Sequence, residues 1–132
     1  MGFEGIASVN YWEAVSLLLP NEINFKNRNQ KPENDVVNSM LNYGYAILAS
    51  EIAKNIVTLG LDPYCGLLHA DLKRRQSLIF DLIEEFRQQI VDKTVFKLIN
   101  TNQINETNID KRNNSLKWPK KNKKKKKKKP TD

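Results

Sequence analysis

A long apolar stripe between Asp35 and Leu59 constrains this chain more than any other feature. Apolar residues recur there at steps of three and four, which places them on one face of an α-helix: Val37, Leu41, Tyr45, Leu48, Ile52, Ile56 and Leu59. A second stripe lies beside it: Val36, Met40, Gly44 and Ile47. So wide an arc predicts a helix buried on more than one side. Asn34 or Asp35 can cap its start, and Gly60 marks its end. Further helices must therefore pack around it.

Helical spacing also appears on both sides of this segment. Residues 1–19 predict a helix with Glu4 in its first turn, because apolar side chains recur every three or four positions until Pro20. Ser77 can cap a helix that runs to about residue 98, with a break or kink near residues 88–92. Residues 21–34 predict a loop. No strand pattern alternates, so we expect an all-α domain over residues 1–100.

Composition excludes several classes of protein. Hydrophobic residues form 39% of the 132 residues, enough for one small core. No apolar run approaches the length of a membrane helix, and no basic segment followed by an apolar one indicates a secretory signal. Cys65 is the single cysteine, which excludes an internal disulfide and a cysteine-built zinc site. A reducing cytoplasm is the expected compartment.

The net charge of +7 is distributed very unevenly. Residues 117–132 hold ten lysines and one aspartate, a balance of +9, while residues 1–116 hold 12 basic and 14 acidic residues, a balance of −2. The run from Lys123 to Lys129 has strong self-repulsion and no apolar group to bury. We therefore expect residues 101–132 to be a polar linker and a disordered lysine-rich tail, able to attract nucleic acid without sequence preference.

A few residues could carry chemistry. Asp81 and Glu84 lie three apart on a predicted helix, so both project from one face, where paired carboxylates can hold a divalent cation. Apolar neighbours place Asp81 at the edge of a core, where a carboxylate needs a partner. Paired carboxylates are also common on solvated helix faces, which is the interpretation that the spacing alone favours, and the apolar background of Asp81 shifts the balance toward a partner. His69 alone is more typical of a packed or surface residue than of a ligand. From the residues alone, plain solvation is also the favoured interpretation of the basic loop residues: Arg28, Lys73, Arg74 and Arg75.

Three stretches of the chain extend this interpretation by resemblance. They read GFEGIASVNYW from Gly2, NSMLNYGYAILASEIAKNIVTLGLDPYCGLLH from Asn38 and SLIFDLIEEFRQQIVD from Ser77. Together they closely resemble the C-terminal helical domain of the CRISPR-associated spacer-acquisition integrase, the universal CRISPR adaptation endonuclease family. Several unlike motifs match in one order over about residues 2–98. The family's N-terminal β-rich domain has no counterpart here, so a truncated copy or gene fragment is one expectation.

The resemblance implies a set of metal ligands. The family's catalytic glutamate matches Glu4, its histidine matches His69 and its aspartate matches Asp81, while Glu84 matches a further acidic position suited to an outer contact. Oxygen ligands with one imidazole suit Mn²⁺ and tolerate Mg²⁺, the cofactors that the family uses. The same resemblance implies that Arg28 and the basic run Lys73, Arg74 and Arg75 bind DNA phosphates.

The resemblance also implies an activity and partners. In the family, a DNA 3′-hydroxyl attacks a phosphodiester of the repeat, and the same site hydrolyses DNA. The implied partners are double-stranded DNA, as spacer precursor and repeat, a second copy in a homodimer, and a small adaptation subunit. No membrane partner is implied. A different class of function stays open: a non-catalytic remnant, or a helical module that binds nucleic acid through its basic tail.

Overall fold

The computed structural model describes residues 2–23, 25–30, 35–66, 76–104, 109–110 and 115–116. The helical elements are α1 (Phe3–Leu18), α2 (Val36–Thr58), α3 (Ser77–Phe86), the π-helical segment η1 (Arg87–Asp92) and α4 (Lys93–Asn100). A two-residue antiparallel ladder pairs β1 (Ile109–Asp110) with β2 (Ser115–Leu116). The predicted all-α class is confirmed, although no sequence pattern indicated the small ladder. The predicted tail, residues 117–132, lies outside the described residues.

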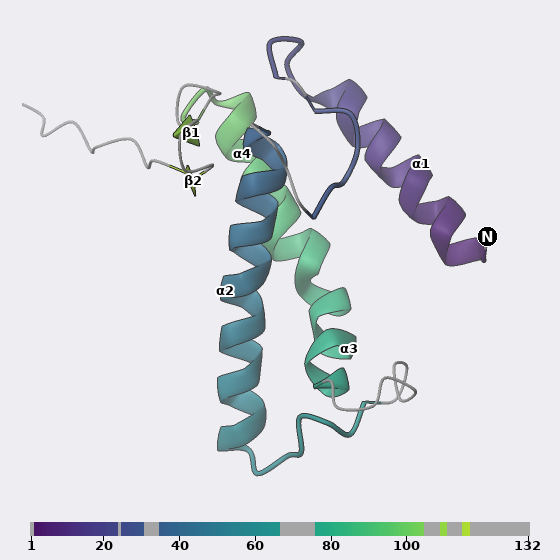
Figure 1. The fold of residues 1–132 in the computed structure, drawn as a ribbon, viewed down its shortest axis with the longest axis vertical. Helices are drawn as coiled ribbons and strands as arrows, with labels where there is room; N and C mark the ends of the chain where they lie inside the picture. Colours follow the sequence, from purple (N-terminus) through teal and green to yellow (C-terminus); the bar gives the residue numbers. More distant parts are fainter. Residues whose placement is uncertain are drawn as a thin grey trace, which may run out of the picture.

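The centre of the fold is an antiparallel pair of long helices. α3, η1 and α4 follow one another without a break and run back along α2 (Figure 1). The expected irregularity near residues 88–92 is the π-helical turn of η1, where the helix widens by one residue. α2 and η1 approach closely at Gly44, where an added Cβ would come within 2.5 Å of Val91 Cγ1. Glycine is needed there because the two helices leave no room for a side chain.

The predicted ends of α2 are confirmed. The Asp35 carboxylate accepts a hydrogen bond from the backbone N–H of Asn38 at 2.9 Å, which satisfies a donor in the first turn. Gly60 has φ +70°, a left-handed conformation that glycine adopts at little cost after a helix. Leu59 at this end is exposed, although it belongs to the apolar stripe. The stripe therefore predicts the helix over its full length and the burial only of its inner turns.

Two apolar cores of unequal size hold the pair together. The larger one lies where the start of α2 meets α1 and α4, and contains Trp12, Val15, Leu19, Phe25, Val36, Val37, Met40, Leu41, Val91, Val95, Ile99 and Ile104. The smaller one lies near the loop that joins α2 to α3, and contains Ile56, Ile79 and Ile83. We call these two regions the core end and the loop end of the helix pair. They differ in how much apolar surface they bury, which sets their stability.

α1 packs on the core end through one face only. Trp12 and Val15 are buried, whereas Val9 and Leu17, which helped to indicate this helix, are exposed. Phe3 is 95% exposed, and α1 splays away from the helix pair toward its N-terminal end (Figure 1). Within the described ranges, no helix combines the length and the apolar character needed to cross a membrane.

Ser77 has a different role from the predicted one. Gln76 is the N-cap of α3, and Ser77 is the first helical residue. The Ser77 hydroxyl donates to the Tyr64 carbonyl at 2.8 Å and accepts from the Gly66 N–H at 2.9 Å. Ser77 therefore fastens the end of the loop after α2 onto the start of α3. A serine before a helical pattern predicts an N-cap, but the Ser77 hydroxyl instead bonds the backbone of Tyr64 and Gly66, which lie 11 to 13 residues earlier in the chain.

Candidate active-site cleft

A cleft of about 510 Å³ opens among α1, α2 and the α3–η1 helix. Each of these elements supplies part of its wall, as does the loop before α2: Ser8, Trp12, Arg28, Gln30, Tyr45, Ala46, Ala49, Phe80, Ile83, Glu84 and Arg87. The wall thus combines two arginines and one glutamate with apolar side chains. Such a mixture is typical of sites that bind a charged ligand within an apolar frame.

Arg28 is held firmly in this wall by α2. Its Nη1 donates to Asn38 Oδ1 at 3.0 Å and its Nη2 to Asn42 Oδ1 at 2.5 Å. Asn38 is fully buried and also bonds the backbone of Asn27 and Asn29, so it fixes the whole turn around Arg28. Burial lowers the pKa of Arg28 from its ordinary value, but a guanidinium remains protonated at neutral pH. The structure therefore places a rigid cation at the edge of the cleft.

A buried carboxylate joins the three walls. Asp92 is 1% exposed and accepts hydrogen bonds from the hydroxyl of Tyr11 on α1, at 2.8 Å, and from that of Tyr45 on α2. Burial and, after it, the Asp92 hydrogen bond raise the pKa of both tyrosines above their ordinary value. Both hydroxyls therefore keep their protons as donors. The sequence did not single out Asp92, although a charge among the apolar residues of a helix was an available signal.

Arg87 and Glu84 form a second charged group on the α3 side. Two parallel contacts join them, from Arg87 Nη2 to Glu84 Oε2 at 2.8 Å and from Nη1 to Oε1 at 2.9 Å. The guanidinium carbons of Arg87 and Arg28 lie 5.9 and 5.3 Å from the centre of the Tyr45 ring. Arg87 Nε is buried and has no hydrogen-bond partner within the described part of the chain. The guanidinium groups of Arg28 and Arg87 therefore both lie near the Tyr45 ring, in the wall of the cleft.

The predicted metal ligands are only partly within the described residues. Glu4 is exposed in the first turn of α1, one helical turn before Ser8, and Asp81 is half-buried on α3, one turn before Glu84 and Glu85. The position expected for Asp81 at the edge of a core is confirmed. His69 lies outside the described residues, as do Lys73, Arg74 and Arg75. In the described ranges, no three metal-ligating side chains gather closely enough to hold an ion.

Comparison with known proteins decides the family. The model of the family "CRISPR associated protein Cas1" matches residues 1–129. The chain belongs to the Cas1 family. The family resemblance inferred from the three sequence stretches is therefore confirmed.

Curated Cas1 proteins are similar over most of the chain. A CRISPR-associated protein Cas1 from Methanobrevibacter ruminantium is 61% identical over 116 residues, which cover 88% of this chain and 35% of that protein. A CRISPR-associated endonuclease Cas1 from Archaeoglobus fulgidus is 47% identical over 119 residues, covering 86% of this chain and 34% of that protein. The chain thus spans about a third of the length of these relatives.

Solved structures of Cas1-like proteins share the fold. A Cas1 protein from Thermotoga maritima has a TM-score of 0.75 and 31% identity, over 88% of this chain and 38% of that one. A casposase bound to an integration product has a TM-score of 0.73 and 36% identity, over 87% of this chain and 33% of that one. The helix pair with α1 beside it is therefore shared with a part of each of these two proteins.

Proposed function

We propose that this chain forms the metal-dependent catalytic part of a Cas1 endonuclease and integrase, which cuts and joins phosphodiester bonds of double-stranded DNA. The observation that supports the proposal is that Glu4 and Asp81 each lie one helical turn from a residue that lines the cleft. Glu4 precedes Ser8 by one turn on α1, and Asp81 precedes Glu84 and Glu85 by about one turn on α3. Ser8 and Glu84 both line the cleft. Residues one helical turn apart share a face, so both carboxylates belong to the faces that border it.

The third ligand of the proposal is His69. Gly66 is hydrogen-bonded to Ser77 at the start of α3, and His69 follows Gly66 by three residues. Three residues of chain span at most about 11 Å. The same helix carries Asp81 one turn further on. This short sequence separation supports a shared site for His69 and Asp81.

The donor set fits Mn²⁺ or Mg²⁺. Glu4, Asp81 and His69 would supply carboxylate oxygens and one imidazole, a set that suits Mn²⁺ well and Mg²⁺ adequately. A bound cation of this kind neutralises charge on a reacting phosphate and favours a deprotonated nucleophile. Glu84 is held by Arg87 and would not bind the metal directly. It would instead orient a water or one of the ligands.

The arginines give the cleft its phosphate affinity. Arg28 and Arg87 would pair with nonbridging phosphate oxygens, while the runs at Lys73, Arg74 and Arg75 would bind the flanking backbone. In the proposed reaction a DNA 3′-oxygen forms a new bond to phosphorus, and the strand that leaves keeps its oxygen and takes up a proton. Water replaces the 3′-hydroxyl in hydrolysis. The spacer precursor and the repeat are the proposed DNA substrates, with a second copy and a small adaptation subunit as protein partners.

Two readouts test the metal site. Mn²⁺ at about a hundredfold excess over its dissociation constant should raise the free energy of unfolding by about 2.7 kcal/mol. Asp81→Ala should abolish this gain together with Mn²⁺-dependent nicking of DNA, and His69→Ala should weaken both. Glu51→Ala is the control, because Glu51 is an exposed carboxylate on α2 that does not line the cleft. If Mn²⁺ leaves the melting temperature of the intact chain unchanged, the site is not assembled.

The charge distribution favours a second candidate, DNA binding through the basic tail alone. Residues 117–132 carry +9, against −2 for residues 1–116. If the tail dominates, a chain ending at residue 116 should bind DNA far more weakly, with a flatter dependence on salt. Equal affinity and an equal salt slope would instead assign binding to the cleft and the loops. A tail-dependent affinity without Mn²⁺-dependent nicking would favour the non-catalytic alternative.

A further inference from the structure

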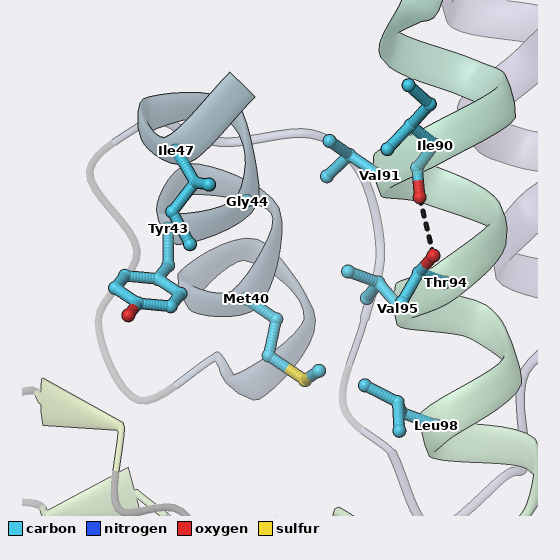
Figure 2. Close-up of a pocket in the computed structure, with 9 residues that line it drawn as sticks. All are labelled: Met40, Tyr43, Gly44, Ile47, Ile90, Val91, Thr94, Val95 and Leu98. Atoms are coloured by element: carbon cyan, nitrogen blue, oxygen red, sulfur yellow. Dashed lines mark hydrogen bonds between the residues drawn. The ribbon is translucent and has the colours of Figure 1, made fainter. Parts of the chain in front are cut away.

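An apolar groove lies on another face of the helix pair, between α2 and the η1–α4 segment. Its volume is about 260 Å³, and its walls are almost wholly apolar: Met40, Tyr43, Gly44, Ile47, Ile90, Val91, Thr94, Val95 and Leu98. Figure 2 shows the α2 side chains facing those of the other helix across the groove. None of its lining residues belongs to the cleft described above. This groove is therefore a separate site.

Both walls of the groove expose large apolar side chains to solvent. Ile47 is 48% exposed and Ile90 is 50% exposed, on opposite walls. Its volume falls just below the range of about 300–1,000 Å³ that is usual for drug-sized ligands, so it suits a single large side chain. Gly44 is one of the lining residues, and a larger residue there would collide with Val91. The lining predicts an apolar occupant.

Thr94 offers a polar group to such an occupant. The Thr94 hydroxyl donates its proton to the Ile90 carbonyl at 2.5 Å, as Figure 2 shows. Its remaining lone pairs can accept a hydrogen bond, and it has no second proton to give. A side chain that is apolar over its faces and carries one N–H donor at its edge matches this wall. The indole of tryptophan has that chemistry, since its Nε1–H is a donor only.

The described chain ends against α2, one of the two helices that form this groove. β2 contacts α2, the helix that supplies Met40, Tyr43 and Ile47 to one wall. β2 ends at Leu116, and the sequence continues Lys117-Trp118-Pro119. Two residues of chain extend up to about 7 Å. The α2 wall from Met40 to Ile47 is about 10 Å long. Trp118 is also the only large apolar residue after Leu116.

We propose that Trp118 inserts into this groove and fastens the start of the basic tail to the helix pair. Its indole faces would pack between Ile47 and Ile90, and its N–H would donate to Thr94 Oγ1. The lysines from Lys120 onward would then leave from a fixed point on α2. This role does not depend on the proposed nuclease activity, because it uses no residue of the cleft.

Tryptophan fluorescence of the intact chain tests the proposal. Trp12 and Trp118 are the two tryptophans, so the wild-type spectrum minus that of Trp118→Phe reports Trp118. The expected signal is blue-shifted and quenched by acrylamide several-fold less than that of a free tryptophan peptide. Ile47→Gln should shift it to the red and restore full quenching. Val57→Gln should change neither, because Val57 is an exposed apolar residue further along the same helix. Glutamine is neutral, so neither variant attracts the lysine run by charge.

Other results would overturn the proposal. A red-shifted, fully quenched Trp118 signal in the wild-type chain would show that the groove does not hold it. Protection that disappears on dilution, together with dissociation of a dimer, would assign the groove to Trp118 of a second copy. Melting temperatures give an independent check. The effects of Trp118→Ser and Ile47→Gln should be strongly non-additive, whereas those of Trp118→Ser and Val57→Gln should add. Additivity in both pairs would contradict the contact.

Discussion

The two ends of the helix pair are built very differently. At the core end, α1, the loop before α2, and α4 all pack around the start of α2, and twelve residues are buried together. At the loop end, three isoleucines form the whole buried cluster. Asp81 on α3 belongs to the loop end, where Leu78 and Leu82 of the same helix pack against the three isoleucines. The comparison teaches that the fold draws most of its stability from one end, while the candidate cleft extends from Trp12 and Arg28 at that end to Ile83 and Glu84 at the other.

Such a division has a physical reason. Metal ligands and phosphate contacts must be reachable from solvent, so the elements that carry them cannot be covered on every side. The core end supplies the rigidity that they lack. The buried Asp92 lies between the two ends and joins α1 and α2 to η1 through two tyrosine hydroxyls. Asp92 therefore helps to fix α1, α2 and η1 relative to one another, and all three helices supply residues to the cleft.

The largest loss of stability should come from truncating a buried side chain at the core end. Leu41 is fully buried in the larger cluster, so Leu41→Ala should lower the free energy of unfolding by about 4 kcal/mol. Ile83→Ala removes a side chain of similar size from the smaller cluster, which can relax toward solvent, and should cost about 2 kcal/mol. Urea denaturation measures both. Equal losses would show that the two ends contribute equally, and would break the comparison.

The next largest effect is the pH dependence of stability that the hydrogen bonds of Asp92 with Tyr11 and Tyr45 should produce. Stability should fall as the pH rises above about 10, the ordinary pKa of tyrosine. Burial and the Asp92 hydrogen bond raise the pKa of Tyr11 and Tyr45 in the folded chain, so the unfolded chain loses these protons first and is favoured. Each tyrosine contributes at most about 1.4 kcal/mol per pH unit, and less because solvent screens these half-buried hydroxyls.

Denaturation at several alkaline pH values measures this slope. Tyr45→Phe should reduce it, because this variant removes one of the two hydroxyls that donate to Asp92 and whose pKa is raised in the folded chain. A wild-type stability that stays constant across this range would show that Asp92 does not hold the two hydroxyls in solution. The network would then not join the two ends, and the cleft walls would be positioned by packing alone.

The sequence predicted the helices well and their burial less well. Periodic apolar residues place α2 correctly, because Val37 and Leu41 are fully buried at the spacing that indicated them. The same pattern does not predict that Leu59 and Ile47 are exposed, because periodicity indicates which residues share a helix face but not whether another element covers that face. For α1, the face that packs is the one with Trp12 and Val15, and the positions at Val9 and Leu17 are open.

The candidate site was predicted in part by resemblance and in part not at all. Sequence motifs proposed Glu4, His69 and Asp81 as ligands and Arg28 as a phosphate contact, and the structure places Arg28 in the cleft wall. The roles of these residues remain predictions. Asp92 was missed because its partners are distant in the sequence: Tyr11 lies 81 residues from Asp92, and Tyr45 lies 47. Contacts at such separations follow from tertiary packing and leave no local pattern.

The smallest effect should come from the turn that anchors the loop end. Ser77→Ala removes two hydrogen bonds, to the Tyr64 carbonyl and from the Gly66 N–H, and should cost about 1 kcal/mol of unfolding free energy. Its local effect should be larger than its global one. Because Gly66 leads into the segment with His69, loss of the anchor should speed hydrogen exchange at residues 64–66 and weaken any stabilisation by Mn²⁺. Ser50→Ala, at an exposed position in the middle of α2, is the control. If Ser77→Ala changes neither the exchange nor the response to Mn²⁺, the loop end is ordered by its isoleucines alone, and the anchor has no part in presenting His69.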